Sequence, residues 1–243
     1  MSKAGFWTTT ALFTATALLG GAAQAQQAGD LVLGAGWLHF APQDSSEPLQ
    51  VTTAAGTQTK EGSGAKVSNA NTLGLNAVYY FDSNWGVEGV LGVPPKFKLD
   101  GTGTLAAVGR IGEAKQWSPT VLLRYTFLDG NDKFRPFVGV GGTYVWYSGV
   151  NLTSGINTAL GLSSSAFTTT AKLSKSWAPV VNAGATYQFD RNWGLSFSVS
   201  YIPLDTKATL TTRANATGTT VATSRTKLTL DPIVSYLALT YKF

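Results

Sequence analysis

Runs of about ten residues in which apolar and polar side chains alternate recur along most of this chain. Alternation at every second position is the pattern of a β-strand with one face on apolar surroundings. The connections between the runs alternate in length: segments 82–84, 129–134 and 190–192 are short, whereas 41–70, 95–116, 148–176 and 206–225 are long. Short turns at one end and long loops at the other are typical of transmembrane β-barrels.

The sequence therefore predicts an all-β fold: an eight-stranded antiparallel transmembrane β-barrel with short periplasmic turns and long extracellular loops. A spanning helix needs about 20 consecutive apolar residues, and no stretch after the first 25 residues provides them. The eight predicted strands are Asp30–Phe40, Asn71–Phe81, Trp85–Pro94, Trp117–Leu128, Arg135–Tyr147, Trp177–Phe189, Trp193–Asp205 and Thr226–Phe243.

Residues 1–25 have the pattern of an export signal: Lys3, then an apolar stretch, then Ala23-Gln24-Ala25 as a cleavage motif. We therefore expect residues 1–25 to be removed and residues 26–243 to form the barrel domain in the bacterial outer membrane. A transmembrane anchor is the alternative, but the apolar core is short and interrupted by Thr.

Odd-numbered residues, taken as outward-facing on every strand, are largely apolar, as contact with outer-membrane lipid requires. Aromatic residues near the short turns predict a girdle at the membrane boundary. The residues predicted for this girdle are Tyr79, Phe81, Trp85, Phe127, Phe189, Trp193 and Phe243. A last strand that ends at Phe243 also resembles the signal read by the barrel-assembly machinery, which we expect as a partner.

Even-numbered residues then face the lumen, and near the short turns they include Glu88, Arg124 and Lys242. Glu88 and Arg124 fall at similar heights on neighbouring strands, so an ion pair between them is expected. An eight-stranded barrel is only wide enough for side chains to fill. These three residues are therefore predicted to plug the periplasmic half, either as a purely structural plug or along an ion pathway.

The upper lumen is predicted to be apolar, unlike the water-filled interior of a porin. Such a lining suits a small hydrophobic molecule, whose affinity comes from apolar surface removed from water. A solid core is the alternative interpretation. The predicted lining residues are Leu38, Phe40, Val90, Leu122, Val138, Val140, Tyr144, Trp146, Ser200, Ile202 and Val234.

Prolines recur at similar heights on several predicted strands, although Pro has no N–H to give to a sheet ladder. Pro94, Pro119, Pro203 and Pro232 are therefore candidates for a lateral gate through which a solute leaves the lumen into the bilayer. The alternative is that these prolines only end strands near the outer rim.

Catalytic and cofactor chemistry have little support in the sequence. His39 is the only histidine, it is outward-facing in this frame, and the chain has no Cys, so zinc, thiol and Ser-His-acid chemistries lack their residues. The net charge of +5 is scattered without a basic stripe. We therefore predict no enzyme activity, no cofactor, no metal site and no nucleic-acid partner.

Several motifs together resemble the OmpW family of small outer-membrane proteins over nearly all of residues 26–243. The motifs are Asn71-Thr72-Leu73-Gly74-Leu75, Trp85-Gly86-Val87-Glu88, Phe134-Arg135-Pro136-Phe137, Lys175-Ser176-Trp177, Asp190-Arg191-Asn192-Trp193, Leu230-Asp231-Pro232 and the terminal Tyr241-Lys242-Phe243. The resemblance implies an eight-stranded barrel with a hydrophobic channel for passive entry of small apolar compounds. Val90 matches an apolar constriction position of the family, whereas Ser200 stands where a constricting aromatic residue can occur.

The predicted function is passive uptake of small hydrophobic molecules across the outer membrane, through an apolar upper lumen with lateral exit into the bilayer. Two alternatives stay open: a structural or surface-binding barrel, of the receptor or adhesion type, with a solid lumen, and a narrow ion pore. The sequence leaves the solute and the oligomeric state undetermined.

Overall fold

The computed structural model describes residues 26–153, 155–159 and 166–243, so the predicted signal segment 1–25 lies outside the described residues. Eight antiparallel strands follow one another around a closed barrel, because β10 pairs with β11 and β1 pairs with β17. This confirms the predicted fold. The barrel strands are β1 (Leu31–Ala41), β6 (Ala70–Tyr80), β7 (Trp85–Gly92), β10 (Thr120–Thr126), β11 (Phe134–Leu152), β13 (Ser176–Gln188), β14 (Trp193–Tyr201) and β17 (Ile233–Lys242).

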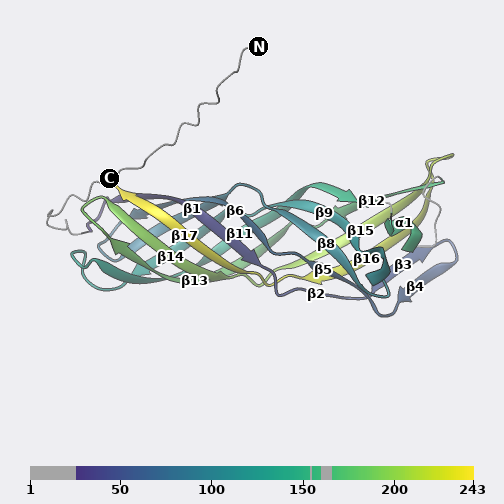
Figure 1. The fold of residues 1–243 in the computed structure, drawn as a ribbon, viewed down its shortest axis with the longest axis horizontal. Helices are drawn as coiled ribbons and strands as arrows, with labels where there is room; N and C mark the ends of the chain where they lie inside the picture. The colour runs from purple at the N-terminus through teal and green to yellow at the C-terminus, as the bar shows by residue number, and fades with distance from the viewer. Residues whose placement is uncertain (1–25, 154, 160–165) are drawn as a thin grey trace, which may run out of the picture.

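The long connections lie at one end of the barrel, as predicted, but most of their residues are in strands. They form an extension that nearly doubles the length of the molecule (Figure 1). In one sheet the order is β12-β15-β16-β3-β4 with β2 on β16, and the other continues the barrel wall as β11-β9-β8-β5. The extension comprises β2 (Ser45–Ser46), β3 (Leu49–Thr53), β4 (Gly56–Lys60), β5 (Ser63–Val67), β8 (Lys96–Gly103), β9 (Arg110–Trp117), β12 (Phe167–Leu173), β15 (Asp205–Ala214) and β16 (Thr220–Thr229), with a 3₁₀ helix at Ala106–Val108 and α1 at Gly155–Ala159.

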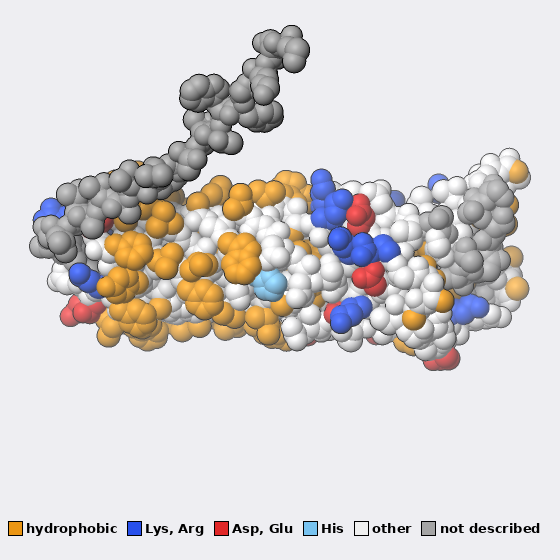
Figure 2. All heavy atoms as spheres, in the orientation of Figure 1, with side chains coloured by type: hydrophobic (Ala, Val, Ile, Leu, Met, Phe, Trp, Pro, Cys, Tyr) orange, Lys and Arg blue, Asp and Glu red, His pale blue; other side chains and the backbone are white. Residues whose placement is uncertain are grey.

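The outer surface of the barrel carries a continuous apolar belt, which Figure 2 shows ending where the extension begins. All seven residues predicted for the aromatic girdle are at least 40% exposed near the short turns. A second aromatic group lies at the other edge of the belt, where Trp117 stacks on Trp146 and Tyr144 contacts Trp177. The belt thus has aromatic residues at both edges, as a barrel crossing a bilayer has.

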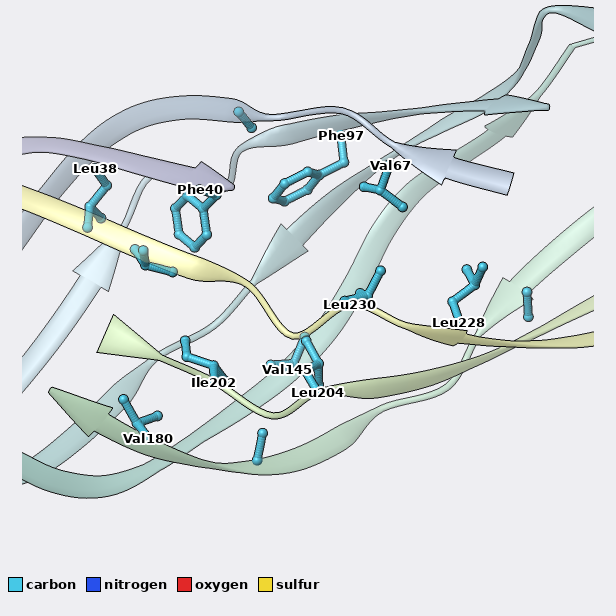
Figure 3. Close-up of a cluster of buried hydrophobic side chains, with 14 of the residues drawn as sticks. Leu38, Phe40, Val67, Phe97, Val145, Val180, Ile202, Leu204, Leu228 and Leu230 are labelled. Carbon is cyan, nitrogen blue, oxygen red and sulfur yellow. The ribbon is translucent and has the colours of Figure 1, made fainter. Parts of the chain in front are cut away.

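The hydrophobic core runs without interruption from the upper barrel into the extension. Figure 3 shows Leu38, Phe40, Phe97, Leu204 and Leu230 pointing into one interior where the two parts meet. The rings of Phe40 on β1 and Phe97 on β8 make an edge contact with centroids 5.9 Å apart. Among the described residues, no helix has the length and apolar character needed to cross a membrane.

Candidate functional site

A cavity of about 50 Å³ lies inside the barrel, just below the junction with the extension. Seven of the predicted lining residues border it: Leu38, Phe40, Val90, Leu122, Ser200, Ile202 and Val234. All except Val90 and Ser200 are buried. Ser200 accepts a hydrogen bond of 2.8 Å from the Asn182 side-chain amide, so its side of the wall is polar. The cavity therefore has an apolar roof and, toward the short turns, polar walls formed by Glu88, Asn182 and Tyr236.

Glu88 and Arg124 form the predicted ion pair, with Arg124 Nη1 3.3 Å from Glu88 Oε2 and both side chains less than 10% exposed. On the ladder, Glu88 lies opposite Leu122 and Arg124 opposite Gly86, so the pair is diagonal. Asn76 Nδ2 donates to Glu88 Oε1 at 2.8 Å, and the Tyr236 hydroxyl donates to Asn76 Oδ1 at 3.1 Å. The carboxylate is thus held from two further strands.

Arg124 also contacts β11 and β13, the first and second strands from β10 around the barrel. Its Nη2 donates to Thr186 Oγ1 at 3.1 Å, and its guanidinium lies 3.3 Å from the centre of the Phe137 ring. Its Nε has no hydrogen-bond partner among the described residues. The guanidinium thus links groups on β7, β11 and β13 below the cavity, and a further cavity of about 20 Å³ lies on the short-turn side.

Lys242 is the third residue predicted for the plug. It lies at the short-turn end, where its Nζ is 3.8 Å from Asp30 Oδ2. A residue that sequence reasoning missed, Arg135, also closes this end: it is 3% exposed and donates to the carbonyl oxygens of Phe127, Ser83 and Leu128 and to the Gln26 side chain.

Four predicted lining residues were assigned to the wrong face of β11. Val138 and Val140 are 44% and 57% exposed on the outer surface. Tyr144 and Trp146 alternate with the buried Thr143 and Val145, and their rings contact the exposed Trp177 and Trp117. The lumen face of β11 consists of odd-numbered residues instead.

The cause is the turn before β11. Five residues separate the directly opposed Tyr80 and Gly86, and five separate Gln188 and Gly194, whereas ten separate Thr126 and Phe137. Leu128, at φ 65°, lies in this longer turn. Leu123 of β10 consequently faces Val140, and directly opposed residues share one face of a sheet. The residues that face the lumen therefore change from even-numbered to odd-numbered at this turn. They are even-numbered again on β13, whose Val180 and Asn182 are buried.

A second, larger cavity lies in the extension and was not predicted from the sequence. It measures about 70 Å³ and lies between the two extension sheets. Apolar side chains dominate its lining, including Leu49, Leu99, Ile111, Leu173 and Leu228. All of these except Leu228, which falls in the predicted strand Thr226–Phe243, lie in segments that were interpreted as loops. The alternation Thr206, Ala208, Leu210, Thr212, all buried, was the signal that could have identified this interior.

The backbone ladder between β7 and β10 is interrupted near Pro94 and Pro119. The β7–β10 ladder ends at the pair Val90–Thr120, and pairing resumes only at Gln116 N–H to Pro95 O, 3.1 Å, and at Lys96 opposite Lys115. The residues at the gap bond to the strands on their other sides. Val93 N–H donates to Leu73 O at 2.9 Å, and Pro119 O accepts from the Thr143 hydroxyl and the Tyr144 N–H.

A groove of about 460 Å³ runs along the outer face of the wall at this height. Its lining is almost wholly apolar and includes Leu33, Leu75, Leu91, Pro119 and Val121. Val90 and Thr120, the last pair of the ladder, line both this groove and the cavity inside the barrel. Only the thickness of this residue pair separates the lumen from the outer face.

Pro203 and Pro232 lie at no such gap, contrary to the prediction that they belong to a lateral gate. The Ile202 N–H donates to Pro232 O at 3.2 Å and the Leu230 N–H to Leu204 O at 2.8 Å, so backbone bonds cross this seam on both sides of the prolines. The Asp231 carboxylate accepts from the Leu204 N–H at 3.0 Å. These prolines mark the place where β14 and β17 pass into β15 and β16.

The described residues contain no group of three or more His, Asp or Glu side chains arranged to hold a metal ion. His39 lies at the upper edge of the apolar belt, where its Nδ1 is 2.8 Å from Asn71 Oδ1 (Figure 2). The site itself consists of apolar cavities above a buried ion pair.

Known outer-membrane proteins are similar to this chain in both sequence and structure. The sequence model of the OmpW family matches residues 27–243. Outer membrane protein W of Vibrio cholerae is 33% identical over 221 residues, which cover 90% of this chain and 91% of that protein. A more distant relative, the dibenzothiophene metabolism operon protein PahQ of Pseudomonas aeruginosa, is 27% identical over 75% of this chain and 76% of its own length.

Among solved structures, the crystal structure of the outer membrane protein OprG from Pseudomonas aeruginosa superposes with a TM-score of 0.77 at 28% identity. It covers 91% of this chain and 99% of OprG. The agreement extends beyond the barrel, because the covered share includes most of the extension strands.

Proposed function

This chain belongs to the OmpW family of outer-membrane β-barrels, and we propose that it admits small hydrophobic molecules passively and releases them sideways into the bilayer. The observation that carries the proposal is the pair Val90–Thr120, which lines the lumen cavity on one side and the outer apolar groove on the other. The route has three parts: the extension, the upper lumen and the gap at Pro94 and Pro119.

The extension supplies the entrance. Its apolar cavity and that of the upper barrel belong to one hydrophobic interior, joined where Phe40 meets Phe97. An apolar molecule gains about 25 cal/mol for each Å² removed from water. This interior therefore attracts such solutes from the extracellular side, whereas ions and sugars would lose their hydration in it.

The lower barrel supplies the reason for a lateral exit. The buried Glu88–Arg124 pair and its partners leave little space below the cavity. A solute above this plug meets polar and charged groups beneath it, whereas at the end of the β7–β10 ladder Val90 and Thr120 separate it from the outer groove. The apolar groove outside, lined by Leu91 and Val121, continues the hydrophobic path to the lipid.

Passage requires side chains to move. A cavity of about 150 Å³ holds one benzene molecule, and the two interior cavities measure about 50 and 70 Å³. The structure thus corresponds to a closed state, and Leu38, Phe40 and Val90 are the side chains that must shift to let a ring pass. The name of PahQ links that relative to the metabolism of dibenzothiophene, an aromatic sulfur heterocycle, and supports aromatic solutes as the class to test first.

The first test is uptake of the apolar dye N-phenyl-1-naphthylamine by cells that express the chain. Val90→Arg places a charge at the narrowest part of the route and should reduce protein-dependent uptake to the background of cells without the protein. Val90→Leu is the matched control and should retain it. Equal uptake by the arginine and leucine variants, with both barrels folded, would exclude this route.

The lateral exit needs its own test. Gly92 and Ser118 border the lumen cavity on the two sides of the gap, so cysteines at both positions can be joined by a short bifunctional thiol reagent. Joining them should block uptake. The same reagent on cysteines at Ala183 and Val199, which already oppose each other in the unbroken β13–β14 ladder, should leave uptake unchanged. Unimpaired uptake after joining the gap would place the exit elsewhere.

A surface-binding barrel with a solid lumen is the second candidate, and the small interior cavities favour it. The extension consists of paired strands, and all five residues of β4, at its far end, are exposed and available to a partner. If dye uptake is at background for the unmodified chain, surface binding becomes the better account, and deletion of 54–59 should then affect ligand binding rather than permeability.

A further inference from the structure

A basic patch covers the outer face of the sheet that continues the barrel wall. Its members are Lys66, Lys96, Lys98, Arg110 and Lys115, on β5, β8 and β9, with the carboxylates of Asp100 and Glu113 among them. Five cations and two carboxylates leave a net charge of +3 on this small area. Figure 2 shows charged side chains gathered directly beyond the apolar belt, over the position of β5, β8 and β9 in Figure 1.

The charges of the patch are incompletely paired. Lys96 lies directly opposite Lys115 across the β8–β9 ladder, and like charges in this position destabilise a sheet. Lys96 binds Glu113 at 2.9 Å and Arg110 binds Asp100 at 2.6 Å, which uses both carboxylates. Lys66, Lys98 and Lys115 make no ion pair with any residue that the structure describes.

The hydrogen bond from Lys96 lowers the pKa of Glu113, and the ion pair of this carboxylate is with Lys96 rather than with Lys115. Three ammonium groups are thus left facing outward on one flat sheet surface. An anion with several acceptor oxygens would relieve their repulsion, because lysine ammonium groups act as compact charges toward phosphate.

The position of the patch identifies the anion. Lys115 is two residues from Trp117, which belongs to the aromatic group at the upper edge of the apolar belt. Basic residues next to a membrane-spanning segment lie at the height of lipid headgroups. The outer leaflet of this membrane consists largely of glycolipids that carry phosphate on their sugar headgroup.

We propose that the basic patch is a binding site for the phosphorylated headgroup of an outer-leaflet glycolipid, with Lys98 and Lys115 as the principal contacts. The acyl chains of that lipid would lie against the apolar belt below. The site is independent of the solute route, since none of these lysines lines either interior cavity.

The test is binding of fluorescent diphosphoryl lipid A to the full chain in mixed non-ionic micelles. Each basic residue near a headgroup contributes a factor of about five to lipid affinity. Lys98→Gln/Lys115→Gln should therefore weaken binding at least about tenfold. Lys60→Gln/Lys133→Gln removes the same charge at the last residue of β4 and in a short turn, and it should change affinity less than about twofold.

Chemically dephosphorylated lipid A should bind all variants equally weakly, and unheated gel electrophoresis verifies that each barrel is folded. Equal affinity of the two double variants for diphosphoryl lipid A would overturn the site. Equal binding of the phosphorylated and dephosphorylated lipids would overturn headgroup recognition. Full displacement of the lipid by millimolar inorganic pyrophosphate would instead assign the patch to soluble anions.

Discussion

Breaking the buried ion pair is the perturbation with the largest expected effect on the barrel. Glu88→Gln preserves the shape of the side chain but removes its charge. Arg124 would then remain inside the barrel with Thr186 Oγ1 and the Phe137 ring as its contacts, and its Nε already has no partner among the described residues. Removing one partner of a buried pair costs about 3–5 kcal/mol.

The magnitude for this pair should fall within that range because both side chains are less than 10% exposed. Arg124→Met should cost a similar amount, since it leaves the Glu88 carboxylate with the Asn76 amide at 2.8 Å. The double variant removes both charges and should lose less stability than the two single variants together. Groups in direct contact differ from additivity by about 0.5–3 kcal/mol.

The assay is urea unfolding of the chain in lipid vesicles, followed by tryptophan fluorescence. Trp85 and Trp193 lie exposed near the short turns and report on the membrane boundary. The reasoning is refuted if Glu88→Gln changes the unfolding free energy by less than about 1 kcal/mol, or if the single effects simply add in the double variant. Either result would mean that water replaces the lost partner and that the plug is open.

Three further predictions concern the wall and the extension. Gly36→Ala should destabilise the barrel by about 1–3 kcal/mol in the same assay, because its Cβ would collide with a carbonyl oxygen of β17, whereas Gly89→Ala, with open space around it, should not. Val140→Arg places a charge in lipid near the bilayer midplane and should lower the unfolding free energy by about 2–4 kcal/mol. If Val140 faced water instead, the same substitution would have little effect. Asp205→Asn should cost less than about 1 kcal/mol of unfolding free energy at pH 7, because a hydrogen bond from Lys227, and then one from Thr229, lowers the pKa of Asp205. This stabilisation is present above the ordinary carboxyl pKa and is lost as the pH falls through the lowered value, so the variant and the unmodified chain should be equally stable at strongly acidic pH.

The barrel could be predicted from the sequence because each short turn joins two runs that alternate clearly. Tyr80 and Trp85 flank the first such turn, and Phe81 N–H bonds back to Trp85 O at 3.1 Å. Lipid outside and a packed lumen inside impose opposite demands on the two faces of every strand. The side-chain pattern therefore contains enough information to identify the strands, to within a few residues at each end.

The extension could not be predicted in the same way because its strands face water on one side and contain few large apolar residues. All five residues of β4 are exposed, and β15 buries only Thr, Ala and Leu side chains. Pairing partners are also far apart in sequence, as in Ala222 opposite Thr53. Local patterns carry little information about such contacts, so these segments were interpreted as loops and the apolar cavity between them was missed.

The assignment of the lumen-facing residues of β11 was wrong for a different reason, because the sequence of this strand does indicate which face points inward. One inward parity was applied to all strands, although parity is conserved only where an odd number of residues lies between directly opposed positions of the two strands. Evaluated by itself, β11 has a more apolar even-numbered face, with Val138, Val140 and Trp146, and an odd-numbered face that carries Arg135 and Thr143. Each face of a strand reports its own surroundings. Assigning the frame strand by strand would have placed Arg135 inside the barrel and identified a second buried arginine that closes its lower half.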